Sequence, residues 1–308
     1  MSAQSSKALW PSLSMATSAL FWGTAWYPLH RIGDAGISPS WSAVLIYVIP
    51  AVIAAPLILF RRRTIRSGGW PLLFVGLGVG ACNALFAAAL AWGEVGIIVL
   101  LFYLNPIWAA VMERVVLGTP IAKFRLVGIG VGILGMVALQ GLSGRWPFPA
   151  NLAEWMGLAA GFCWAVTLVA SNVARGTAIV DQTSLQFVSA AAIALILVVV
   201  LGQQATMPSA GEVRTALPWV LATAGLWIVP AMALSLWAAA RLAPAPASML
   251  LMLEVIVAIA SAAWLNGEAV GLNKLVGGGL ILSATLVEAW GSARSNGKAA
   301  AATAAGSM

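Results

Sequence analysis

Charged side chains are scarce in this chain. Its 308 residues include 16 Lys and Arg and nine Asp and Glu, so that 8% are charged, whereas a soluble domain carries about 25%. Hydrophobic residues make up 61%, and the mean hydropathy is +0.96. So few charges cannot cover a surface in water, which excludes a soluble enzyme, a disordered chain and a collagen-like fibre. The composition predicts a polytopic membrane protein.

Residue types used in catalysis and metal binding are also scarce. The chain has one histidine and contains no Gly-x4-Gly-Lys-Ser/Thr, His-Glu-x-x-His or Gly-x-Ser-x-Gly motif. Its two cysteines, Cys82 and Cys163, lie in apolar runs, where packing thiols are expected and disulfides or zinc sites are not. We therefore expect no enzyme activity, no cofactor or metal, and no ATP motor. The net charge of +7 is interpreted as a determinant of membrane orientation, with no nucleic acid as partner.

Ten apolar runs follow one another along the chain, each close to the length of about 20 residues that crosses a bilayer core. Twelve of the 16 Lys and Arg residues fall on one side of the resulting topology. By the positive-inside rule that side is cytoplasmic, and both termini lie there. The predicted bounds are 9–29, 40–60, 70–91, 95–113, 124–142, 153–174, 183–202, 216–240, 245–265 and 271–291.

The two halves of the chain share a sequence pattern. The segment LFWGT at 20–24 corresponds to FCWAV at 162–166, in the first and sixth runs. The junction at 117–120 resembles the junction at 266–268, and each precedes a Gly-rich run. Because five spans is an odd number, the second copy must insert with the opposite topology, which predicts an inverted repeat of the kind found in transporters.

The fold prediction is an all-α polytopic membrane protein with ten transmembrane helices in a 5+5 inverted-topology repeat. An inverted repeat places a substrate cavity near the bilayer midplane, and we expect helices 1, 3, 4, 6, 8 and 9 to line it. The predicted segments are a cytoplasmic N-terminal tail at 1–8, a first five-helix repeat at 9–142, a second at 153–291 and a disordered cytoplasmic tail at 292–308.

These features resemble the EamA type of the drug/metabolite transporter superfamily. The resemblance rests on the 5+5 arrangement, on Trp22-Gly23 and Trp164-Ala165, and on Gly267-Glu268 before the last run. The many tryptophans and the segment Tyr103-Leu104-Asn105-Pro106 are most similar to YddG-like aromatic amino acid exporters. The resemblance implies a secondary transporter that exports aromatic and other neutral amino acids across the bacterial inner (cytoplasmic) membrane by alternating access.

Two departures from the family pattern concern the gates and not the fold. Glu254 stands in the ninth run where many relatives have a proline nearby, and Thr119-Pro120 replaces a Gly-Glu pair in the first repeat. The implied partners are a small-molecule substrate and the lipid bilayer. The oligomeric state stays open, and a monomer is compatible with the sequence.

Glu254 is the only ionisable residue near the middle of a predicted run. A polar group at that depth must pair inside the bundle or line a wet cavity. Glu254 is therefore a candidate contact for a substrate ammonium or a protonatable coupling site. The alternative is a hydrogen-bonded carboxyl that ties the ninth helix to a neighbour.

Asn83 and Asn105 are candidate ligands for the carboxylate and ammonium of an amino acid, and Tyr103 adds a phenol nearby. Interhelical hydrogen bonding is the alternative for both amides. For Asn105 it is favoured, because Pro106 removes an amide donor and frees carbonyls that Asn105 can satisfy. Glu113 at the end of the fourth run is expected to pair locally with Arg114 or to reach the interface.

Eleven of the 15 tryptophans divide by depth. Three lie near the middle of predicted runs, Trp22, Trp164 and Trp227, and are candidates for an aromatic cavity wall, with core packing as the alternative. Eight lie near span ends and are interpreted as interfacial anchors, namely Trp10, Trp41, Trp70, Trp146, Trp155, Trp219, Trp264 and Trp290.

Alternating access requires hinges, which we assign to Pro28, Pro106 and Pro230. The alternative function is a broad exporter of drugs or lipophilic cations. In that case the Glu254 carboxylate would act as counter-charge or proton-coupling site, and the aromatic rings would supply cation–π contacts.

Overall fold

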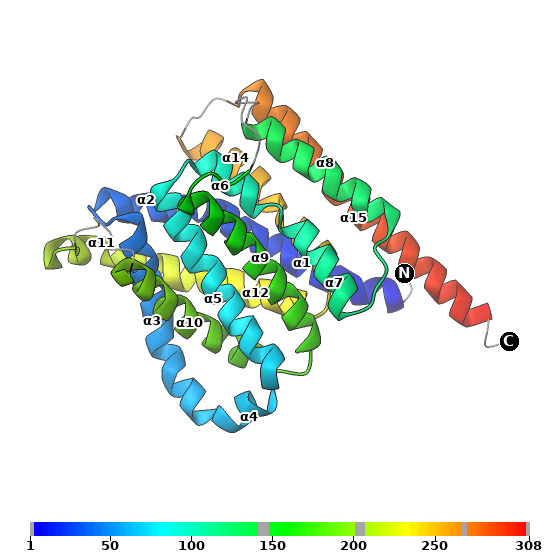
Figure 1. Ribbon diagram of the computed structural model, residues 1–308, viewed down its shortest axis with the longest axis horizontal. Helices are drawn as coiled ribbons and strands as arrows, with labels where there is room; N and C mark the ends of the chain where they lie inside the picture. Colours follow the sequence, from blue (N-terminus) through cyan, green and yellow to red (C-terminus); the bar gives the residue numbers. More distant parts are fainter. Residues whose placement is uncertain (1–2, 141–147, 201–206, 267–269, 306–308) are drawn as a thin grey trace.

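The computed structural model describes residues 3–140, 148–200, 207–266 and 270–305, and every regular element in these ranges is helical (Figure 1). The all-α fold class is therefore confirmed for the described part of the chain. The first half contains α1 (Ala3–Thr24), α2 (Trp26–Asp34), α3 (Pro39–Phe60), α4 (Arg62–Ser67), α5 (Gly69–Trp92), α6 (Val95–Phe102), α7 (Asn105–Val116) and α8 (Lys123–Gln140). The second half contains α9 (Leu152–Val173), α10 (Ile179–Val200), α11 (Ala210–Ala222), the π-helix η1 (Thr223–Ile228), α12 (Val229–Ala239), α13 (Pro244–Leu251), α14 (Leu253–Asn266) and α15 (Leu272–Ala305).

Seven helical segments in the described residues are long and apolar enough to cross a membrane, which makes the chain a multi-pass membrane protein. They overlap seven of the ten predicted runs. The other three runs, 9–29, 124–142 and 271–291, coincide with α1 and α2, α8, and α15, and stay predictions as membrane crossings. The seven segments are Pro39–Phe60, Gly69–Leu90, Ile97–Val116, Leu152–Val173, Ile179–Val200, Ala210–Ala239 and Pro244–Leu265.

Polar residues fix the start of several helices. The Ser38 side chain accepts a hydrogen bond from the Trp41 amide, and Pro39 occupies the first turn of α3, where its missing N–H has no consequence. Ser209 and Glu212 form a reciprocal capping box at the start of α11. These local signals place helix ends independently of tertiary packing.

Four of the predicted runs are broken helices. The fourth run divides into α6 and α7 at Tyr103, the ninth into α13 and α14 at Met252, and the first into α1 and α2 at Ala25. The eighth is interrupted by η1, and π-helical turns often occur at functional sites. Pro106 and Pro230 lie in the first turns of α7 and α12, after such interruptions.

Helices of one half pack mainly on helices of the other half. The helix α5 lies against α9, α10 against α3 and α5, and α1 against α12 and α14. Figure 1 shows α1 and α9 in the middle of the bundle and α8 and α15 paired along one edge. A Cβ atom on Gly277 of α15 would lie 2.7 Å from the carbonyl oxygen of Gly135 of α8, so glycine is what permits this close approach.

The structure differs from the predicted tails. The helix α15 continues to Ala305, through most of the 292–308 segment that was expected to be disordered, and α1 begins at Ala3 within the predicted 1–8 tail. The segment 298–305 is mostly alanine, the residue with the highest intrinsic helix propensity, and it extends a helix that has already been nucleated. The backbone preference therefore outweighs the low complexity of this segment.

Candidate functional site

A cavity lies between the two halves, lined by residues of the first, third, fourth, sixth, eighth and ninth predicted runs. Its volume is about 80 Å³, well below the roughly 300–1,000 Å³ of cavities that hold drug-sized ligands. A substrate of amino acid size therefore requires the surrounding helices to separate. The lining residues are Trp22, Cys82, Asn83, Phe86, Phe102, Trp164, Met232, Leu251 and Glu254.

Four of the seven predicted binding residues line this cavity, namely Trp22, Asn83, Trp164 and Glu254. Trp22 Nε1, Asn83 Nδ2 and Trp164 Nε1 are buried and have no hydrogen-bond partner in the described residues. An unsatisfied buried donor costs about 1–3 kcal/mol, so three around one cavity are a costly arrangement in a protein interior. The three donors and the Glu254 carboxyl give the cavity wall the complementary groups for a zwitterion.

Tyr103 connects to this site through Glu254. Its phenol donates a hydrogen bond to Glu254 Oε1, and the Tyr103 side chain is buried. Tyr103 stands between α6 and α7, whereas Glu254 is the second residue of α14. Glu254 therefore lines the cavity and also ties the ninth run to the fourth.

Asn105 and Trp227, also predicted as binding residues, join helices outside the set of cavity-lining residues. Asn105 Nδ2 donates to the carbonyl of Phe102 at 3.0 Å, and Asn105 Oδ1 accepts from the Ser248 hydroxyl of α13. Trp227 Nε1 donates to Thr24 Oγ1 at 3.1 Å. The Asn105 amide thus makes the structural bonds that were its favoured alternative, and the Trp227 N–H has a partner on α1.

Phe86, Phe102 and Met232 are apolar members of the cavity wall that the sequence does not single out. Phe86 lies one turn beyond Asn83 on α5, and its ring centre is 4.6 Å from that of Phe102. Met232 closes the wall from α12. An apolar side chain in an apolar helix has no feature that separates a cavity wall from ordinary packing, although the i, i+3 spacing from Asn83 marks the face of Phe86.

A buried ion network lies where α7, α8, α13 and α15 meet. Arg125 Nη1 is 3.1 Å from Glu113 Oε1, and Arg125 Nε is 3.4 Å from Glu288 Oε1. Glu113 Oε2 also accepts from the Ala245 amide at 3.2 Å, at the start of α13. The prediction that Glu113 pairs with Arg114 or reaches the interface was wrong, because burial selects the enclosed Arg125 partner, and Arg114 donates to the Gly118 carbonyl instead.

A second ion pair links the halves at the end of α3. Arg61 Nε and Nη2 contact Asp181 Oδ1 and Oδ2 of α10 at 2.5 and 2.9 Å. This two-point geometry is the strong form of the guanidinium–carboxylate contact. The hydrogen bond and the negative charge of Asp181 raise the pKa of Arg61 above its ordinary value.

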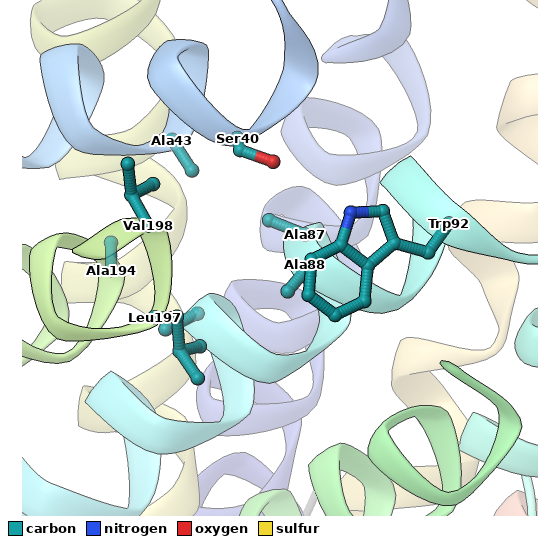
Figure 2. A pocket seen from close by; sticks show the side chains of 9 residues that line it. Ser40, Ala43, Ala87, Ala88, Trp92, Ala194, Leu197 and Val198 are labelled. Carbon is teal, nitrogen blue, oxygen red and sulfur yellow. The ribbon is translucent and has the colours of Figure 1, made fainter. Parts of the chain in front are cut away.

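A smaller cavity lies between α3, α5 and α10, and Figure 2 shows its wall of alanine, Leu197, Val198 and the Trp92 ring. Its volume is about 10 Å³, at the lower limit of roughly 10–15 Å³ that accommodates one water molecule. Ser40 is the one hydroxyl residue among its lining side chains. Size and chemistry exclude it as a substrate site in this conformation.

Comparison with known proteins finds a transporter family that resembles part of the chain. Residues 9–140 match the model of the EamA-like transporter family, and no curated protein sequence matches the chain. The fold is similar to that of a protein crystal structure with a TM-score of 0.67 and 19% sequence identity, a match that covers 94% of this chain and 98% of the other. Residues 9–140, a little under half of the chain, are therefore similar to the EamA-like transporter family, and the structural likeness extends the similarity of fold over nearly the whole chain.

Proposed function

We propose that the chain is a YddG-like secondary transporter that exports amino acids, aromatic and other neutral ones, across the bacterial inner membrane through the central cavity. The observation that carries this proposal is the group of unpartnered donors on Trp22, Asn83 and Trp164 beside the Glu254 carboxyl. A zwitterion offers a carboxylate to the donors and an ammonium to Glu254. Its aromatic side chain would stack on the indole rings and on Phe86 and Phe102.

The packing supports an alternating-access mechanism built on an inverted repeat of five spans in each half. When each helix is replaced by its counterpart in the other half, the α5–α9 contact corresponds to the α12–α1 contact. The α3–α10 and α8–α15 contacts each join a helix to its own counterpart, so they stay the same. Such a pairing is expected of two copies related by a two-fold axis. The helix interruptions near Pro28, Pro106 and Pro230 would be the hinges that let one side open while the other closes.

The predicted topology places both groups of ion pairs, the one at Arg61 and the one at Arg125, on the cytoplasmic side. Arg61 and Asp181 join the end of α3 to α10, while Glu113 and Arg125 join α7 and α8 to α13 and α15. Opening toward the cytoplasm would require these contacts to separate. Their role would thus be to hold that side closed when the cavity faces outward.

A lipophilic-cation exporter is the second candidate, favoured by Glu254 as the one carboxylate among the cavity-lining residues and by the indoles near it. A permanent cation would pair with the carboxylate and lie over aromatic faces. It would leave the indole and amide donors unpartnered, so the zwitterion fits the wall better.

The test is flux of radiolabelled phenylalanine from proteoliposomes, with and without an imposed pH gradient, for the native chain and Glu254→Gln. We expect saturable flux that unlabelled leucine inhibits and tetraphenylphosphonium does not. Flux driven by the gradient and lost in Glu254→Gln would assign proton coupling to Glu254. Flux that is independent of the gradient and retained in the variant would indicate facilitated diffusion. Absence of phenylalanine flux from folded protein, with transport of the cation, would replace the proposal by the second candidate.

A further inference from the structure

A wide groove runs along the outside of the bundle between α1 and α12. Its volume is about 930 Å³, within the roughly 300–1,000 Å³ range of cavities that hold drug-sized ligands. Trp10 and Leu13 are 67% and 46% exposed, so that this wall faces the surroundings of the protein. The residues that matter here are Trp10, Leu13 and Thr17 of α1, Leu234 and Trp237 of α12, and Arg241 beyond the end of α12.

Arg241 is held at one end of this groove. Its guanidinium carbon lies 4.2 Å from the centre of the Trp237 ring, and Nη1 donates to the Trp237 carbonyl at 2.9 Å. No carboxylate of the described residues lies within ion-pair distance of Arg241. A guanidinium has five N–H donors, so most of those on Arg241 stay available for an anion.

The groove has the polarity profile of the membrane interface. Arg241 stands between two membrane-spanning segments, Ala210–Ala239 and Pro244–Leu265, and therefore near the boundary of the hydrocarbon. From Trp10 the groove follows α1 to Thr17, which at 1.5 Å per residue is about 10 Å along the helix. A cation at the boundary and an apolar channel below it match the phosphate and the acyl chain of one lipid.

We propose that this groove binds one anionic phospholipid, with the headgroup phosphate on Arg241 and an acyl chain along Leu13 and Leu234. The charge of Arg241 selects an anionic headgroup, because a zwitterionic headgroup carries a cation that the guanidinium repels. The same two helices line the central cavity from their other faces, through Trp22 and Met232. The bound lipid therefore packs against elements that must move during transport, whatever the substrate is.

The test is native mass spectrometry of the full chain in detergent, with phosphatidylglycerol and phosphatidylcholine of identical acyl chains. We expect the native chain to retain one phosphatidylglycerol with a preference of about tenfold, as one charge-assisted contact provides. Arg241→Gln should abolish the preference. The matched control is Arg63→Gln on α4, which removes the same charge from an exposed position outside the groove and should keep it.

Two further measurements separate the source of the anion and the role of the apolar channel. Glycerol phosphate at millimolar concentration should not displace the lipid, whereas Thr17→Trp should reduce retention of both lipids by filling the groove. Equal retention of the two lipids by the native chain would overturn the proposal. An unchanged preference in Arg241→Gln, an equal loss in Arg63→Gln, or displacement by glycerol phosphate would overturn it as well.

Discussion

The phenol of Tyr103 donates a hydrogen bond to the Glu254 carboxyl, and each of the two residues stands beside the break in an interrupted helix. Tyr103 directly follows α6, and Glu254 is the second residue of α14, two residues after Met252. The bond therefore fixes the relative position of the two interruptions and, at the same time, the orientation of the cavity carboxyl. A change at either residue should affect both the shape of the cavity and the stability of the bundle.

Tyr103→Phe tests this connection, because it removes the phenol donor and keeps the ring. We expect a lower thermal midpoint in detergent, corresponding to about 1–3 kcal/mol for a buried acceptor left without its partner. Phenylalanine flux should fall as well, since the Glu254 carboxyl loses its fixed orientation. Tyr27→Phe is the control, because the Tyr27 hydroxyl makes a single hydrogen bond in the described residues, which it accepts from exposed Arg31 at 3.4 Å. Equal stability of the two variants would mean that the Tyr103 bond contributes nothing.

The indoles of Trp22 and Trp164 can be tested for ring stacking and for hydrogen bonding separately. Substitution by Phe keeps an aromatic face and removes Nε1, whereas substitution by Ala removes both. We expect Phe variants to raise the KM for phenylalanine by about five- to tenfold, the loss of roughly one hydrogen bond. The Ala variants should raise the KM for phenylalanine further. Trp155→Ala, a ring that is 50% exposed, is the control. Intact phenylalanine transport in a folded Trp22→Ala, Trp164→Ala double variant would contradict the substrate assignment.

The helical class and part of the cavity could be predicted because their signals are local. Trp22, Asn83, Trp164 and Glu254 are conspicuous as polar or amphipathic groups inside apolar runs, and a bilayer allows such groups few locations. The carbonyl freed near Pro106 also indicated a structural role for Asn105, whose Nδ2 donates to Phe102. The depth of these residues in the membrane therefore predicted four members of the cavity wall, and Pro106 predicted the structural role of Asn105.

The remaining contacts depend on tertiary structure that no local pattern encodes. Glu113 has Arg114 as its neighbour in sequence, yet it pairs with Arg125, which in turn contacts Glu288 at the far end of the chain. Trp227 was expected in the cavity wall from its depth alone. Trp227 lies in the π-helical segment η1, which interrupts the eighth run. Its Nε1 donates a hydrogen bond to Thr24 of α1 instead.

The ion pair of Arg61 and Asp181 leads to a prediction about pH. Asp181 raises the pKa of Arg61, so the stabilisation from this protonation is fully present below the unfolded pKa of an arginine and is lost only as pH rises through the still higher pKa of the folded state. Between pH 6 and 9 the difference in thermal midpoint between the native chain and Arg61→Gln should therefore stay constant. The measurement is a series of melting curves in one detergent. A difference that shrinks steadily from pH 6 to pH 9 would show that another group controls the contact.

Among the described basic residues, we expect substitution of Arg125 to lower the stability of the protein most. Arg125→Gln leaves Glu113 and Glu288, which are 4% and 2% exposed, without their shared cation. Loss of one member of a buried ion pair destabilises proteins by about 3–5 kcal/mol, because the remaining charge stays buried without its counter-charge. Melting curves of purified protein at neutral pH should register this as a large fall in thermal midpoint. Arg114→Gln is the matched control, since exposed Arg114 donates only to a carbonyl in the described residues. Equal midpoints for the two variants would contradict the network, whereas restoration of stability by Glu288→Gln in the Arg125→Gln background would identify the negative charge of Glu288 as the cause.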